Sequence, residues 1–213
     1  TVDGVGGLLN GGTDKEFTIY WCKVARQHFA RALDLLADMI RCSKFEDQDI
    51  ERERQVIIEE LNESMDSPQD RVNRLIDEVV WPGQPLGREI VGTRETVSNI
   101  SRRMLLDYMD CQYGPGSAVV SVAGDIGQDE VLSHIERAFG DWGVTSPRTP
   151  VPADDRQAEP FLCIERRDTE QAHLCLAVRG LSFAHPDRFN LDLLNIILGG
   201  GMSSRLNLEI RER

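Results

Sequence analysis

Two glutamates, Glu53 and Glu60, have the residue type and the spacing that could support metal chemistry. They lie seven residues apart, about two turns of an α-helix, so both side chains leave one face of one helix. Val56 and Ile57 fall on or near this face, which predicts that it runs beside a hydrophobic core. A carboxylate beside a core is costly to bury unless it is paired or binds a metal. The segment is therefore either a solvated charged helix or half of a metal site.

The composition limits the classes of protein to which the chain can belong. It has 213 residues, of which 40% are hydrophobic and 28% charged, as in ordinary globular proteins. Its net charge of −12 disfavours nucleic acid or an anionic membrane as the main partner, because both attract basic surfaces. No run approaches the roughly 18 apolar residues of a membrane-spanning helix.

The cysteines indicate the redox environment. There are five, an odd number, and they are scattered without C-x-x-C spacing. This pattern argues against a disulfide framework or a cysteine-rich zinc site and favours reduced thiols. We therefore expect the cytoplasm or another reducing compartment.

The order of the elements predicts an α+β fold with an antiparallel-rich sheet packed with helices. Apolar residues at helical spacing predict helices over residues 28–42, 47–65, from 68, from 101, 128–139 and 187–198. Strand-like runs cover residues 8–13, 16–24, 118–123, 161–166 and 172–179. The helix that carries the glutamates has Ile50, Val56, Ile57 and Leu61 as its expected inward stripe.

A change in composition divides the chain. Residues 143–160 are rich in proline and lack periodicity, which predicts a linker. Residues 1–142 would then form most of one α+β domain. Residues 161–213 would begin a second, homologous α+β domain.

Five short segments, taken in order, resemble one known family. They are a glycine turn with an edge strand at residues 6–10, a paired strand at 13–20, the glutamate helix at 51–60, a Pro-Leu-Gly loop at 85–93, and a glycine-rich helix entry at 199–206. Each is weak alone, but their common order resembles the pitrilysin/insulinase-type zinc peptidases, in the branch of the mitochondrial processing peptidases. The resemblance covers essentially the whole chain.

The resemblance implies roles for individual residues. Glu60 would be the third zinc ligand, and Glu53 a carboxylate that orients a ligand. Asn10, Gly11 and Gly12 would lie on an exposed strand edge where a peptide substrate adds as another strand, although a plain glycine-rich hairpin explains them equally well. The full-length protein would be a zinc metalloendopeptidase that hydrolyses peptides or presequences.

One departure decides how much chemistry this chain can hold. The family's H-x-x-E-H motif supplies two zinc-binding histidines and the catalytic glutamate, and it does not occur here. Counting back from Glu60 places the motif upstream of Thr1. We therefore expect no catalytic residue, no stoichiometric zinc and no peptidase activity in residues 1–213 alone. The alternatives are a non-catalytic partner subunit, in a homo- or heterodimer of paralogues, or a peptide-binding module.

Overall fold

The structure is a computed structural model that describes residues 1–145, 149–157 and 159–212. It divides into two compact units, Thr1–His173 and Leu174–Arg213. The described part of residues 143–160 forms no helix or strand, and Pro147 of this predicted linker lies outside the described residues. The linker as a domain boundary stays a prediction. None of the described helices is both long and apolar enough to cross a lipid bilayer.

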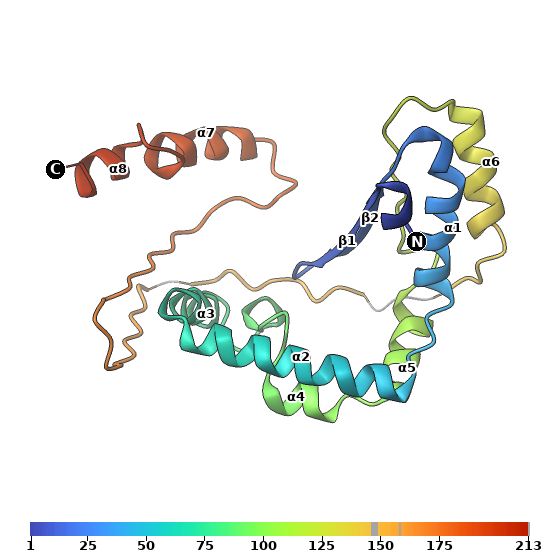
Figure 1. The fold of residues 1–213 in the computed structure, drawn as a ribbon. Helices are drawn as coiled ribbons and strands as arrows, with labels where there is room; N and C mark the ends of the chain where they lie inside the picture. The colour runs from blue at the N-terminus through green and yellow to red at the C-terminus, as the bar shows by residue number, and fades with distance from the viewer. Residues whose placement is uncertain (146–148, 158, 213) are drawn as a thin grey trace. The chain divides into compact units, whose positions relative to one another are not determined.

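A β-hairpin opens the first unit. Strand β1 (Leu8–Thr13) pairs antiparallel with β2 (Thr18–Lys23), with Leu8 opposite Lys23 and Thr13 opposite Thr18 (Figure 1). The turn closes through the Asp14 amide, which donates to the Phe17 carbonyl at 2.8 Å. The predicted hairpin is therefore confirmed, and with the helices around it the α+β class is confirmed too.

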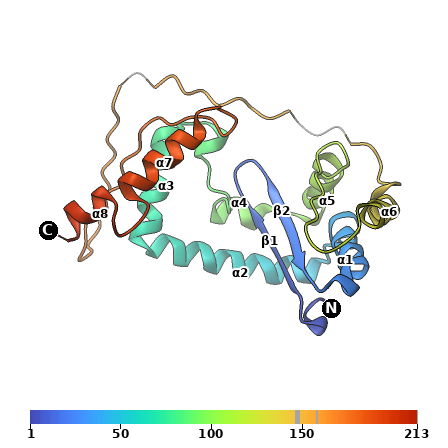
Figure 2. The same ribbon diagram turned by 90° about the horizontal axis from the view of Figure 1, so that it is seen from above.

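Six α-helices lie in the described part of the first unit. They are α1 (Phe29–Arg41), α2 (Asp47–Asp66), α3 (Pro68–Val80), α4 (Arg94–Asn99), α5 (Arg102–Gln112) and α6 (Gln128–Phe139). Helix α1 lies beside α6 in both views and also packs on β2 (Figures 1 and 2). Short 3₁₀ turns cover Asp3–Val5, Arg26–His28 and Pro85–Gly87.

Capping residues explain several helix boundaries. The Ser67 hydroxyl accepts the Asp70 amide and Pro68 takes the first position of α3, as its missing N–H allows. Helix α4 was not predicted, because six residues are too few to show a period. It is bounded by a capping box in which the side chains of Thr93 and Thr96 each accept the other's backbone amide.

The second unit contains two helices, α7 (Arg188–Gly199) and α8 (Arg205–Ile210). The Ser204 hydroxyl caps α8 by accepting the Asn207 amide. Helix α7 confirms the helix predicted over residues 187–198, with each end shifted by one residue.

Three predicted strands are wrong in the part of the chain that the structure describes. Residues 118–123, 161–166 and 172–179 carry no strand assignment there, and β1 and β2 form its one sheet. A strand is stable only when its backbone pairs with a neighbour and one face is covered. Neither holds here, since Val119 is 94% exposed and Leu174 90% exposed. Their apolar composition had indicated buried strands.

The core beneath α2 corrects the predicted inward stripe. Ile58 and Leu61 are buried against Val97 of α4, with Ile57 packed at the margin. Val56 is instead 46% exposed. It follows Glu53 by three residues and precedes Glu60 by four, so it shares their face rather than the core face. Ile58, which the stripe omitted, takes its place.

Arg54 fastens α2 to the end of α4. Its guanidinium donates to the carbonyls of Val97 and, at 2.7 Å, Ile100, and its Nε donates to Glu51 at 3.0 Å. These carbonyls lie at the C-terminus of α4, where helical hydrogen bonding ends and a cation is favourable. Hydrogen bonds from Gln55 and Arg54 lower the pKa of the Glu51 carboxyl. Arg54 thus acts as a side-chain cap across two helices.

We expect Arg54→Met to lower the free energy of unfolding by about 2 kcal/mol, because two carbonyls lose a charged donor while the apolar stem remains. Urea unfolding of the chain measures this change. Arg52→Met is the matched control, since Arg52 is exposed and its one ion pair among the described residues is with Asp49, at 3.3 Å on the same helix. An equal loss in both variants would show that the cap contributes nothing.

A salt-bridge network holds the chain after residue 160 on α3. Glu165 accepts hydrogen bonds from Arg71, at 2.9 and 2.6 Å, and from Arg167 at 2.6 Å. Arg167 also donates to the Met65 carbonyl at 2.8 Å. The hydrogen bonds from Arg71 and Arg167 lower the pKa of Glu165 from 4.5 to about 2.

This lowered pKa predicts how stability depends on pH. The folded state keeps the Glu165 carboxylate ionised at a lower pH than the unfolded state does. The contribution of Glu165 to the free energy of unfolding is therefore complete above about pH 4.5 and is lost as the pH falls toward about 2. Urea unfolding of Glu165→Gln and the unmodified chain at about pH 6, 4 and 3 should therefore show a difference that shrinks with acidity. Glu170→Gln, an exposed glutamate of the same segment, should show no such trend. A difference independent of pH would refute the assignment.

Candidate metal-ligand helix and strand edge

Glu53 and Glu60 both project into solvent from α2. Within the described residues, neither carboxylate makes a hydrogen bond or an ion pair. Glu59 is also exposed, as expected for a surface residue, but on a different side of the helix. The two predicted site residues therefore present unengaged carboxylates on one face, with Val56 between them.

The described residues do not by themselves complete a metal site. They contain no group of three or more histidine, cysteine, aspartate or glutamate side chains that could hold a metal ion. A catalytic zinc site needs three protein ligands and an open position. Glu60, the predicted ligand, is a single carboxylate, and the described residues around it do not complete such a site.

The four histidines have other surroundings. His134 contacts the Phe29 ring edge-on, and its imidazole pairs with Arg137. His185 Nδ1 accepts the Asp187 amide at 3.1 Å. His28 lies at the start of α1, beside Gln27. His173 is exposed. The contact of His134 with Phe29 joins α6 to α1, and the contacts of His185 and His28 are local.

Asn10, Gly11 and Gly12 are consecutive residues of β1, and all are exposed. In the described sheet β1 pairs only with β2, so its other edge has free backbone groups. The Asn10 Oδ1 atom accepts the Gly11 amide at 2.8 Å. A peptide that adds to this edge must displace that contact, which the side chain of Asn10 can release by rotating.

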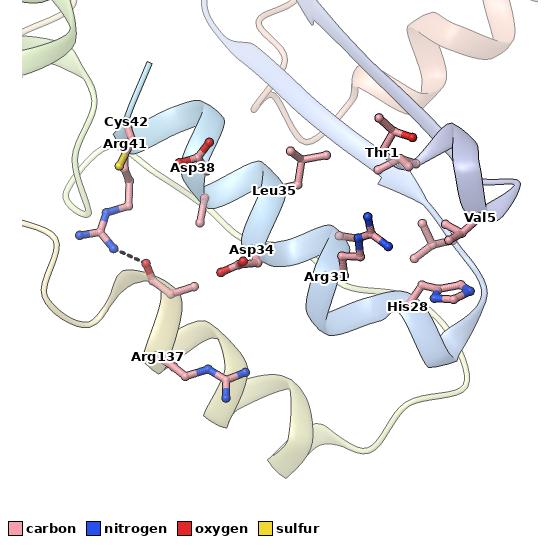
Figure 3. A pocket seen from close by; sticks show the side chains of 15 residues that line it. Thr1, Val5, His28, Arg31, Asp34, Leu35, Asp38, Arg41, Cys42 and Arg137 are labelled. Atoms are coloured by element: carbon pink, nitrogen blue, oxygen red, sulfur yellow. Dashed lines mark hydrogen bonds between the residues drawn. The ribbon is translucent and has the colours of Figure 1, made fainter. Parts of the chain in front are cut away.

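Figure 3 shows a surface hollow of about 480 Å³ between the N-terminus, α1 and α6. Its charges are mixed, with Arg31, Arg137, Asp34 and Asp38 around the opening (Figure 3). Arg41 is engaged with the Ala138 carbonyl and, at 2.7 Å, with Asp141. The lining of this hollow contains none of the predicted site residues.

Two side chains with long-range roles were not singled out from the sequence. Arg54 sits in a glutamate- and arginine-rich run that is typical of a solvated face, yet it binds α4. Lys15 sits in a hairpin turn, yet it binds α3 and the loop that follows it. The local signal for Arg54 is its position among the apolar residues Ile50, Ile57 and Leu61 of α2; Lys15 has none.

Comparison with known proteins decides the family. The family model described as Insulinase (Peptidase family M16) matches residues 1–94, and the one described as Peptidase M16 inactive domain matches residues 99–213. The chain belongs to peptidase family M16, the insulinase family. The resemblance carried by the five ordered segments is thereby confirmed at the level of the family.

The relatives and solved structures that this chain resembles are longer than the chain. An uncharacterized zinc protease of Bacillus subtilis is 37% identical over 99% of this chain and 51% of its own length. Among solved structures, a protease from Helicobacter pylori matches 98% of this chain and 52% of that chain, at 22% identity and a TM-score of 0.77. An M16 inactive domain from Pseudomonas fluorescens matches 100% of this chain and 52% of that chain, at 20% identity and a TM-score of 0.77. The chain thus spans about half the length of these relatives, and the structures show the shared fold.

Proposed function

We propose that this chain is part of a zinc metalloendopeptidase in which Glu60 is one zinc ligand. The observation that carries the proposal is the pair Glu53 and Glu60, unengaged on one solvent face of α2 within the region that matches the M16 peptidase domain. The name zinc protease given to the Bacillus subtilis relative supports the metal. The remaining ligands and the catalytic base would come from residues outside this chain.

Glu53 would orient a ligand of the same metal. It precedes Glu60 by two turns and projects from the same face, so its carboxylate could accept a hydrogen bond from a neighbouring ligand. Zinc bound by such a set would act as a Lewis acid on a peptide carbonyl. This chain would contribute the negative charge of Glu60 and the position of both carboxylates on α2.

The substrate would be an unfolded peptide or a presequence. It would add to β1 at Asn10, Gly11 and Gly12, where main-chain hydrogen bonding recognises an extended peptide without regard to its side chains. The net charge of −12 favours basic peptides. The five scattered cysteines, odd in number, favour the cytoplasm or another reducing compartment.

A second candidate is a non-catalytic partner subunit of the processing-peptidase type, paired with a paralogue. The match of residues 99–213 to the M16 inactive domain favours it. The presence of both Glu53 and Glu60 favours the peptidase, since a subunit that binds no zinc has no chemical need for either carboxylate.

Glu60→Gln in the full-length protein tests the ligand. We expect its zinc content to fall from about one per chain to below about 0.2, because a neutral amide is a poor ligand for zinc. Metal analysis after dialysis against a weak chelator measures the content. Glu59→Gln removes the same charge from an adjacent residue and should keep the zinc. Equal zinc content in the two variants would refute the role of Glu60, and full-length protein without zinc would favour the partner subunit.

The charge of the chain predicts a preference among substrates. We expect the full-length protein to cleave a peptide carrying Lys and Arg about tenfold faster, in kcat/KM, than one of equal length carrying Asp and Glu. Added salt should reduce the ratio, because it screens long-range attraction. Equal rates for the two peptides at low salt would contradict an electrostatic preference.

A further inference from the structure

Among the described residues, β1 pairs with β2, and the hairpin contacts the rest of the unit through β2 and through its turn. On β2, the Tyr20 hydroxyl hydrogen-bonds the Tyr113 hydroxyl, next to the end of α5, at 2.9 Å, and α1 packs against the same strand. Strand β1 is exposed along its whole length. The position of the β1 edge is therefore set indirectly, through the pairing with β2 and through the turn.

Lys15 is the residue of the turn that reaches the rest of the unit. Its ammonium donates to the Asp77 carboxylate in α3 and, at 2.5 Å, to the Leu86 carbonyl in the Pro85–Gly87 turn. Only 24% of the Lys15 side chain is exposed, so these bonds are partly shielded from water. They join segments that are 62 and 71 residues apart in the sequence.

Both acceptors sit on a rigid corner. The Asp77 carbonyl accepts the Trp81 amide at 2.9 Å, which ends α3. Gly87 packs so closely on this corner that a Cβ there would lie 2.2 Å from the Trp81 carbonyl oxygen. The Gly87 amide also donates to the Gln84 carbonyl at 3.1 Å. The ammonium of Lys15 thus binds a side chain near the end of α3 and a carbonyl of a closely packed turn.

Hydrogen bonds within the turn connect the Lys15 contacts to β1. The Lys15 amide donates to the Asp14 carboxylate at 2.6 Å, and Thr13 and Thr18 hydroxyls lie 3.3 Å apart across the first pair of the ladder. Gly12 and Gly11 are the next residues of β1 on the side of Thr13 away from the turn. Glycines weaken a strand because they have more conformational freedom to lose, so this edge depends on restraint from its ends.

We propose that Lys15 is a positioning residue that fixes the β1 edge for strand addition by a peptide, with Asp77 as its partner. The proposal rests on the proposed function, in which the substrate adds at Asn10, Gly11 and Gly12. An edge that is ordered before binding spares the peptide complex the entropy of ordering it. Lys15 therefore acts on the affinity for an extended peptide and leaves the chemical step unchanged.

Two measurements on the full-length protein test the role of Lys15. Hydrogen–deuterium exchange reports the order of residues 8–13, and a quenched-fluorescent peptide of about 12 residues, rich in Lys and Arg, reports KM and kcat. For Lys15→Met we expect about fivefold faster exchange in β1 and about fivefold higher KM, with kcat changed less than about twofold. Asp77→Asn should produce the same changes and add nothing to Lys15→Met. Lys15→Arg should restore most of the wild-type KM.

Lys23→Met is the matched control, because Lys23 is an exposed lysine of the same hairpin whose ammonium has no partner among the described residues. It should change neither exchange nor KM. Unchanged β1 exchange in Lys15→Met, or a fall in kcat at constant KM, would overturn the positioning role. A wild-type protein that does not cleave the peptide would contradict the proposed function instead, and the exchange comparison would still decide whether Lys15 orders β1.

Discussion

The packing of α2 on α4 fixes which carboxylates face outward. Ile58 and Leu61 bury against Val97, and each such side chain contributes roughly 1.5–3 kcal/mol when removed from water. Arg54 adds a polar contact at the same interface by donating to the carbonyls at the end of α4. With the rotation of α2 set this way, Glu53, Val56 and Glu60 necessarily share the solvent face. The candidate ligand is thus placed by the hydrophobic core rather than by any contact of its own.

Arg54 and Lys15 each connect elements of the first unit through charged hydrogen bonds. Each long cationic side chain binds at least one backbone carbonyl and a carboxylate, and each reaches a carbonyl more than 40 residues away in the sequence. Such contacts cross elements that share little apolar surface. In a unit with few fully buried side chains, charge-assisted hydrogen bonds carry more of the task of fixing one element against another.

The sequence patterns predicted the positions of the helices more accurately than those of the strands. The helical period and caps such as Ser67 and Ser101 are local signals, so α1, α3 and α6 were located closely. A strand depends on a partner that its own residues do not encode, which is why residues 118–123 were misjudged. Val56 was misplaced because an apolar residue on a charged face was assumed to point inward. Lys15 had no local signal, since its partners lie more than 60 residues away.

The candidate site shows the same division. The spacing of Glu53 and Glu60 predicted that they share a face of one helix, and the order of the motifs around them indicated the family. The described residues contain no group of side chains that could complete a metal site with Glu60, so the proposed site depends on residues beyond them. The most direct measurement is an anomalous difference map at the zinc edge from crystals of the full-length protein. We predict a zinc peak about 2 Å from a Glu60 carboxylate oxygen. A zinc peak coordinated without Glu60 would contradict it.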